Sequence, residues 1–370
     1  MAKIAFHLNC LTHGGAERVV TNLANQFAQE GYEVVIATEW TDADEFVPDP
    51  AVRRVHVGLM PEDEKKSRMS RYLIRVRNLH AFMLREKPDV LVAFARLAIF
   101  RSLMACRHTG VPIVISVRID PTKSYVGIRN KLQIARYFDR AAGAVFQTED
   151  ARKFFAPKLQ TNSRIILNPL TEKYIGIAQP DSRRKEIVNV ARLADFKNQP
   201  LLVEAFAKVH VRYPDYVLKI YGPDSEDGTR ERIEQKTEQL HLENFVQLMG
   251  GSDSLEKEVP GAAVFAYSSD YEGMPNSLME AMAMRLPVVA TDCPCGGPRM
   301  LIRNHENGLL VPVGDAQALA DGILYLLDHP KQAQEMGKKA GEIADAANAQ
   351  KIFEQWRDYL SEVIKNGKRC

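Results

Sequence analysis

The amino-acid sequence predicts an α/β protein built from two doubly wound parallel sheets, and three observations lead to this fold class. Short runs rich in valine and isoleucine alternate with helical patterns along the chain, as they do in a parallel sheet with helices on both faces. The alternation is interrupted once, by a polar stretch, and then restarts. The 370 residues are too many for one small core and suit two domains.

The first half opens with a predicted strand at 3–8 and an amphipathic helix at 16–30. The apolar residues from Val19 to Phe27 lie on one stripe of that helix, and Gly31 ends it. The strand signal then recurs, with helices between the strands, at 33–38, 90–94, 113–116, 144–146 and 164–167. We therefore expect a first domain over residues 1–172.

The polar stretch Thr171–Arg184, which contains Gly176 and Pro180, is the predicted linker. A second domain is expected over 183–349. Its strands are predicted at 187–191, 217–221, 245–248, 263–266 and 287–290. Its helices are predicted at 198–212, 229–240, 275–284, 315–328 and 331–345, and a final helix follows at 350–365.

Composition narrows the class of protein. With 45% hydrophobic and 26% charged residues, the chain has the composition of a globular protein, and no apolar run is long enough to cross a bilayer. The N-terminus lacks the pattern of a signal peptide, and the five cysteines are odd in number and scattered, which favours a reducing cytoplasm. Cys293-Pro294-Cys295 is expected to be a loop feature, because a zinc site needs further ligands nearby.

Charge is distributed unevenly along the chain. Residues 1–170 carry a net charge of +8 and residues 171–370 a net charge of −6, which suggests that the first half meets an anion. Basic residues alternate with apolar ones over 65–87. This segment is either a helix on the anionic inner face of the cytoplasmic membrane or a core-facing helix with a solvated basic face. Further basic residues favour a lipid-linked, anionic acceptor: Arg129, Lys131, Arg136 and Arg140. No aromatic platform accompanies them, so nucleic acid is not an expected partner.

The segment from Ser268 to Met282 contains the largest group of candidate ligand-binding residues. Glu272 and Glu280 stand eight positions apart, and Pro275 between them fits the first position of a helix. The free backbone N–H groups of Asn276 and Ser277 would then form an anion site. An anion site flanked by carboxylates suits a sugar joined to a diphosphate. The alternative is a pair of solvated glutamates on a surface helix.

Two more loops follow predicted strands. Gly14 and Gly15 come after the strand at 3–8, where they either let backbone approach an anionic ligand or form a plain turn. Arg192 and Lys197 come after the strand at 187–191. They are either diphosphate ligands or surface charges. Because ligands of such sheets bind outside the carboxyl ends of the strands, the sequence predicts a site in a cleft between the domains.

These motifs together resemble those of family 4 glycosyltransferases. The run Gly14-Gly15-Ala16-Glu17-Arg18, Arg192 with Lys197, and Glu272 with Glu280 occur in the same order and at similar spacing. The resemblance covers nearly the whole chain and is strongest to bacterial enzymes of capsule, exopolysaccharide or lipopolysaccharide assembly. It implies the GT-B fold, in which two Rossmann-like domains face each other across an interdomain cleft. It also implies that the C-terminal helix, within 350–370, packs on the N-terminal domain.

The resemblance further implies a retaining transfer from a nucleoside diphosphate sugar, with UDP as the expected nucleotide. The acceptor would be a glycan or a polyprenyl-diphosphate-linked sugar. Arg192 and Lys197 would hold the diphosphate, Glu272 the sugar hydroxyls and Glu280 the ribose. Gly14, Gly15, Gly222 and the segment Gly273-Met274-Pro275-Asn276-Ser277 would also line the donor site. No metal or other cofactor is expected, and Asp42-Ala43-Asp44 is interpreted as a solvated turn.

The chain also departs from the family pattern. Relatives often carry a histidine where this chain has Arg118 and Asp120, so a substrate contact by these two residues is a separate hypothesis. Relatives also often have glycine at Arg285 and an acid at Met300. Three other functions remain open: a glycosidase using Glu272 and Glu280, a nucleotide-sugar epimerase, and a non-catalytic sugar-binding protein.

Overall fold

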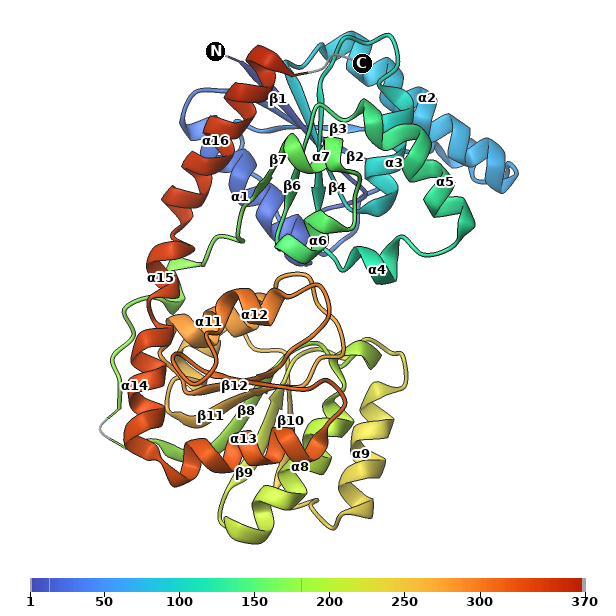
Figure 1. Cartoon of the computed structure of the whole chain (residues 1–370). Helices are drawn as coiled ribbons and strands as arrows, with labels where there is room; N and C mark the ends of the chain where they lie inside the picture. Colours follow the sequence, from blue (N-terminus) through green and yellow to red (C-terminus); the bar gives the residue numbers. More distant parts are fainter. Residues whose placement is uncertain (1, 13, 181, 368–370) are drawn as a thin grey trace. The chain divides into compact units, whose positions relative to one another are not determined.

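The computed structural model describes residues 2–12, 14–180 and 182–367. The chain forms two compact units. Unit 1 comprises Met1–Pro169 and Gln350–Cys370, and unit 2 comprises Leu170–Ala349. Each unit contains one parallel sheet with helices on both faces, which confirms the predicted fold class (Figure 1).

The sheet of unit 1 has seven strands in the order β3-β2-β1-β4-β5-β6-β7. Their bounds are β1 Lys3–Leu8, β2 Glu33–Thr38, β3 Arg53–His56, β4 Val90–Phe94, β5 Ile113–Val117, β6 Gly143–Phe146 and β7 Ser163–Ile165. The sequence prediction missed β3, because its residues Arg-Arg-Val-His carry no apolar run. Strand β3 lies at the edge of the sheet and pairs only with β2. An edge strand is partly exposed, so its sequence can be polar.

Helices cover both faces of this sheet. They are α1 Gly15–Gln29, α2 Arg68–Glu86, α3 Arg96–Ala105, α4 Pro121–Ser124, α5 Ile128–Tyr137, α6 Glu149–Lys153, α7 Pro157–Thr161 and α16 Ala349–Asn366. Alternate residues of β1 show the two layers. Phe6 points into the core shared with α1 and α16, whereas His7 points to the other face, where it bonds Ser102 of α3.

The C-terminal helix α16 packs on unit 1, as the resemblance implied (Figure 1). Its Phe353 ring meets Phe27 edge-on at 4.8 Å, and Trp356 stacks on Phe94 at 5.9 Å. The Tyr359 hydroxyl donates to the Asn162 carbonyl oxygen at 2.6 Å. A helix that follows unit 2 in sequence therefore completes the core of unit 1.

The sheet of unit 2 has six parallel strands in the order β10-β9-β8-β11-β12-β13. Their bounds are β8 Arg184–Val190, β9 Val217–Tyr221, β10 Val246–Gly250, β11 Ala262–Tyr267, β12 Val288–Thr291 and β13 Leu309–Val311. The short strand β13 was not predicted. The predicted linker contains a turn of 3-10 helix, Glu172–Tyr174, whose Tyr174 is buried.

The helices of unit 2 are α8 Gln199–Arg212, α9 Thr229–Gln239, α10 Leu255–Glu258, α11 Asn276–Ala283, α12 Gly297–Leu301, α13 Ala316–Asp328, α14 Pro330–Ala340 and α15 Ile343–Ala346. The prediction of a single helix at 331–345 is wrong. The helix is interrupted at Gly341 and Glu342, between α14 and α15. Among the described residues, no helix is both long and apolar enough to cross a membrane.

Candidate active site

Three of the predicted site residues follow neighbouring strands of unit 2, and two of them are in contact. Arg192 and Lys197 follow β8, and Glu272 follows β11. These two strands are neighbours in the sheet and run parallel, so their carboxyl ends lie at the same edge. The sheet thus brings together residues that are 75 positions apart in sequence.

A tyrosine joins the lysine and the glutamate into one cluster. The Lys197 ammonium forms an ion pair with Oε1 of Glu272 and donates a hydrogen bond to the Tyr267 hydroxyl at 2.8 Å. The Tyr267 hydroxyl in turn donates to the same Oε1 at 2.7 Å. The Lys197 and Glu272 side chains are 14% and 12% exposed, so the cluster is shielded but open to a ligand. Sequence reasoning missed Tyr267. Its position at the carboxyl end of β11, where such sheets bind ligands, could have indicated a site residue.

Hydroxyl and thiol groups support the loop that carries Glu272. Ser269 donates to Oε1 of Glu272 at 3.3 Å, and its own carbonyl oxygen accepts from Thr291 at 2.6 Å and from the Cys293 thiol at 3.3 Å. Burial raises the pKa of Cys293 to about 12, so this residue stays a thiol and a hydrogen-bond donor. Burial, and next the charge of Glu272, also raise the pKa of Tyr267 well above its ordinary value. Tyr267 is therefore a proton donor at neutral pH.

The loop before α8 fixes Lys197 from the other side. Lys197 ends a short 3-10 helix, Asp195–Lys197. Asn198 follows in the left-handed conformation, with φ 47°, and its amide donates to Asp270 at 2.8 Å. The neighbouring rings of Phe196 and Tyr271 stack at 5.0 Å. Contacts on both sides of the Lys197–Glu272 pair thus hold the two loops together.

Arg192 lies on the loop that leads from β8 to Lys197, and its charge is not paired with a carboxylate in the described part of the chain. Its backbone carbonyl oxygen accepts from the Gln199 side chain at 2.8 Å, which fixes the backbone. Its side chain is exposed, and within the described part of the chain its guanidinium has no ion-pair or hydrogen-bond partner. A guanidinium in this state is prepared to bind an anion.

Helix α11 begins one residue later than predicted. Pro275 has extended backbone angles and precedes the helix, whose first residues are Asn276 and Ser277. The predicted first position for Pro275 is therefore wrong, although the N–H groups at the helix start are those expected. Glu280 lies in the second turn and is buried. Gly273 and Met274 are buried in the loop before the helix.

Gly222 is needed for close backbone packing. It follows β9, has φ 145°, and a Cβ atom there would lie 2.0 Å from the Ala191 carbonyl oxygen. Its N–H donates to the Gly250 carbonyl oxygen at 2.7 Å. These contacts place Gly222 directly beside the loop that leads to Arg192. Its contact with a nucleotide stays a prediction.

In unit 1, Gly14 and Gly15 lie at the start of α1. Gly14 caps the helix in an extended conformation, without a side-chain cap, and Gly15 is its first residue. The N–H groups of this first turn point out of the helix at the carboxyl end of β1. The preceding residue, His13, lies outside the described residues. The two glycines are not in the same unit as Arg192, Lys197 and Glu272.

Arg118 follows β5 and is held by neutral partners. Its guanidinium donates to Ser116 at 2.7 Å and to Asn168 at 2.6 Å, and it lies over the rings of Phe94 and Trp356 at 5.1 and 5.5 Å. Burial lowers the pKa of Arg118 to about 9. Asp120 is fully buried and caps α4 through a bond from the Thr122 N–H at 2.8 Å. Both residues thus have structural roles, and their substrate contacts stay predictions.

The basic segment 65–87 contains the whole of α2 and is anchored in the core. Ile74, Leu79, Phe82 and Met83 are its buried apolar side chains. On the same face, Arg75 forms an ion pair with buried Glu39 at 3.2 Å. The exposed side of this helix carries Met69 and Leu73 as well as basic residues, so the membrane contact of the segment stays a prediction.

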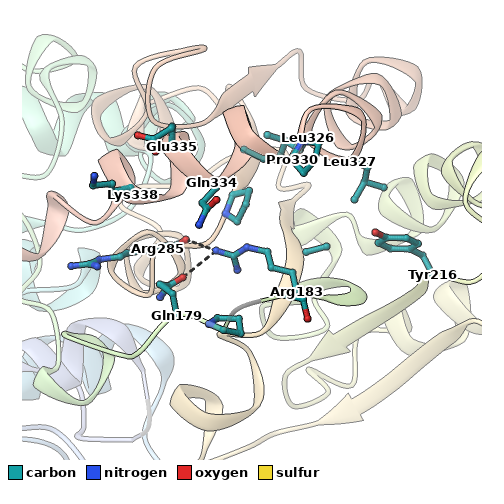
Figure 2. Close-up of a pocket in the computed structure, with 15 residues that line it drawn as sticks. Gln179, Arg183, Tyr216, Arg285, Leu326, Leu327, Pro330, Gln334, Glu335 and Lys338 are labelled. Atoms are coloured by element: carbon teal, nitrogen blue, oxygen red, sulfur yellow. Dashed lines mark hydrogen bonds between the residues drawn. The ribbon is translucent and has the colours of Figure 1, made fainter.

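Unit 2 also contains a cavity of about 530 Å³ near Arg183 (Figure 2). Arg183 donates to the Ala262 carbonyl oxygen at 2.9 Å, to the Arg285 carbonyl oxygen at 3.0 Å and to the Gln179 side chain at 3.1 Å. These bonds tie the start of β11 to the turn that follows α11. The cavity therefore lies at the opposite end of α11 from Asn276, away from the Lys197–Glu272 pair.

Comparison with known proteins adds the family context. The family model described as Glycosyltransferase Family 4 matches residues 13–169, and the model described as Glycosyl transferases group 1 matches residues 171–342. Each unit is thus matched by one of the two models over most of its length.

The similarity extends over whole proteins. The chain is 24% identical to an uncharacterized glycosyltransferase of Haemophilus influenzae, with 97% of this chain and 100% of that protein covered. It is 26% identical to the N-acetylgalactosamine-N,N'-diacetylbacillosaminyl-diphospho-undecaprenol 4-alpha-N-acetylgalactosaminyltransferase of Campylobacter jejuni, with the same coverage. The crystal structure of Anabaena Alr3699/HepE in complex with UDP has the same fold, with a TM-score of 0.80, 17% identity and coverage of 98% of this chain and 100% of that one.

Proposed function

The chain belongs to the family 4 glycosyltransferases of the GT-B fold, and on this premise we propose that it is a retaining enzyme that uses a UDP-sugar. The proposed acceptor is a glycan or a polyprenyl-diphosphate-linked sugar in bacterial surface polysaccharide synthesis. The Campylobacter relative, whose name includes a diphospho-undecaprenol acceptor, supports the lipid-linked class. The relatives do not favour the epimerase alternative.

The observation that carries the proposal is the Lys197–Tyr267–Glu272 cluster, with Arg192 on the loop that leads from β8 to Lys197. An ammonium has three N–H donors, and two of those of Lys197 are used by Tyr267 and Glu272. The third donor and the guanidinium of Arg192 remain for a diphosphate. Both cations lie at the carboxyl ends of parallel strands, where α/β sheets bind their ligands.

Glu272 is arranged to bind the sugar. Its Oε1 accepts from Lys197, Tyr267 and Ser269, whereas Oε2 has no hydrogen bond within the described part of the chain. The charge of the carboxylate is thus balanced on one oxygen, and the other is left to accept from sugar hydroxyls. The nearby N–H groups of Asn276 and Ser277 would bind a phosphate oxygen, and Glu280 would bind the ribose.

The proposed reaction breaks the bond between the anomeric carbon and the phosphate oxygen. The acceptor oxygen forms the new bond on the same face, and its proton passes to the leaving diphosphate. Negative charge grows on that diphosphate in the transition state. Arg192 and Lys197 stabilise this charge from fixed positions, which is usually the largest catalytic contribution in such sites.

The test is an assay with a panel of nucleotide sugars and a polyprenyl-diphosphate-linked acceptor. We expect one UDP-sugar to raise the thermal midpoint of the protein and to give a product with the anomeric configuration of the donor. The proposed reaction uses no metal, so activity should persist in excess EDTA. An inverted product would disprove retention. Consumption of the donor without an acceptor would favour an epimerase.

A further inference from the structure

Helix α5 presents its apolar stripe to solvent. No residue of the helix is buried. Ile128 and Leu132 are 78% and 65% exposed. The two residues are four positions apart and share one face of the helix, and Ala135 continues that face. The apolar stripe of a surface helix normally packs on the core. In α5, Ile134 and Tyr137 on the opposite face are half-buried, whereas Ile128 and Leu132 face solvent.

The outward orientation of α5 is fixed at both ends. Tyr125 precedes the helix and Phe138 follows it, and both side chains are buried. Their rings meet edge-on at 5.9 Å, in a cluster that includes Phe100 of α3. Asn130, within the helix, accepts from Arg96 at 3.2 Å. Because α5 is anchored by these contacts, its apolar stripe cannot turn inward without breaking them.

More apolar side chains lie next to α5 in sequence. Val126, in the loop before the helix, is 58% exposed, and Ile119, before α4, is 45% exposed. Exposed single apolar side chains are common, but several large ones within one short segment are characteristic of a contact surface. We call Ile119, Val126, Ile128 and Leu132 the apolar patch.

Basic residues flank the stripe on both sides. At 100° per residue, Arg129 and Arg136 lie on one side of the Ile128–Leu132 line, and Lys131 lies on the other. The helix carries no acidic residue. An apolar stripe between two basic borders is the pattern of a helix that lies in the headgroup layer of an anionic bilayer. A protein partner with this complementarity would need an apolar groove lined by acids on both sides.

We propose that unit 1 docks on an anionic lipid bilayer through α5 and the apolar patch. The side chains of Ile128 and Leu132 enter the boundary between headgroups and acyl chains, and the flanking cations bind lipid phosphates. The proposed membrane contact lies on α5, where no residue is buried. Helix α2 also exposes apolar side chains, at Met69, Leu73 and Leu84, but it buries four others against the core. This inference deepens the proposed function, in which the acceptor is a lipid-linked sugar.

The test is co-sedimentation of the full chain with lipid vesicles. One set of vesicles is phosphatidylcholine alone, and the other contains about one third phosphatidylglycerol. We expect binding to the anionic set at low salt, little binding to the neutral set, and weakening as salt rises. The double variant Ile128→Ser, Leu132→Ser should bind at least about tenfold more weakly, because two large apolar side chains no longer enter the bilayer.

A matched control uses apolar residues that are equally exposed elsewhere. Val47 and Val211 are both 87% exposed and lie outside the patch, and the variant Val47→Ser, Val211→Ser should bind like the wild type. Transfer to a soluble acceptor is measured in parallel and should be unchanged by the α5 variant, which separates failure of docking from failure of the enzyme. The proposal is overturned if the wild type does not co-sediment with anionic vesicles at low salt, or if the α5 variant binds them as strongly as the wild type. It is also overturned if the wild type is a dimer that this variant makes monomeric.

Discussion

The ammonium of Lys197 and the carboxylate of Glu272 form an ion pair between loops that are 75 residues apart in the chain. The pair is completed by Tyr267, which bonds both partners. A paired, partly shielded lysine is held in one position before any substrate arrives. Such preorganisation allows a cation to stabilise a transition state without first paying the cost of ordering itself.

We predict that Lys197→Ala lowers turnover by about 10²–10³-fold while the fold persists, because the charge that faces the leaving diphosphate is removed. Steady-state kinetics and circular dichroism provide the two measurements. The control is Lys185→Ala, which removes an exposed lysine of the same unit that is paired with Asp215. Activity near the wild-type level in Lys197→Ala would mean that the assigned phosphate role is wrong.

The variant Tyr267→Phe should show how much the tyrosine hydroxyl contributes by positioning Lys197 and Glu272, because it leaves their charges in place. The variant keeps the buried ring and the Lys197–Glu272 pair but removes the hydroxyl that connects them. Because two hydrogen bonds inside a shielded cluster are lost, we expect unfolding to become easier by about 1–3 kcal/mol. Turnover should fall by less than in Lys197→Ala. Urea unfolding and kinetics measure both effects, and unchanged values for both would contradict the bridging role.

Much of the fold follows from the sequence, because buried elements leave periodic patterns. The final helix predicted at 350–365 is α16, whose apolar residues from Ile352 to Val363 are buried at helical spacing. The pattern fails where burial is partial. The edge strand β3 has polar residues and was missed, and so was the end of α14 at Ala340, where the next residues still have helical angles.

The site shows a different limit. Arg192, Lys197 and Glu272 were found because each follows a predicted strand, whereas Tyr267 looks like one more core residue of β11. Its role depends on Lys197, which is 70 positions away in the chain, and no local pattern reveals that contact. The orientation of α5 is a similar case. Periodicity reveals an apolar stripe but does not tell whether the stripe faces the core or the solvent.

Gly222 and Gly251 allow a prediction about backbone space near Arg192. A Cβ atom at Gly222 would lie 2.0 Å from the Ala191 carbonyl oxygen at φ 145°, whereas at Gly251 the nearest atom is 4.0 Å away. We expect Gly222→Ala to destabilise unit 2 by about 2 kcal/mol or more and Gly251→Ala to cost less than about 1 kcal/mol. Thermal or urea unfolding measures both. Equal effects would show that the tight contact with Ala191 is not decisive.

The pH dependence of stability can be tested at Glu86, at the end of α2. Hydrogen bonds from Arg53 at 2.6 Å and from Lys3 at 2.8 Å lower the pKa of Glu86 from 4.5 to about 2. The folded state therefore holds this carboxylate charged at pH values where the unfolded chain has already protonated it. The resulting stabilisation is complete above about pH 4.5 and is lost as the pH falls towards 2.

Glu86→Gln should remove this contribution. Because Arg53 is half exposed and solvent screens the pair, we expect a loss of about 1 kcal/mol at pH 7 rather than the larger value that the pKa shift alone implies. The difference from the wild type should shrink between pH 4.5 and 3, as measured by urea unfolding at each pH. Glu33→Gln is the matched control, since Glu33 contacts the same two cations but is exposed, and its effect should be smaller. A difference between Glu86→Gln and the wild type that does not change with pH would show that Glu86 acts through packing rather than through charge.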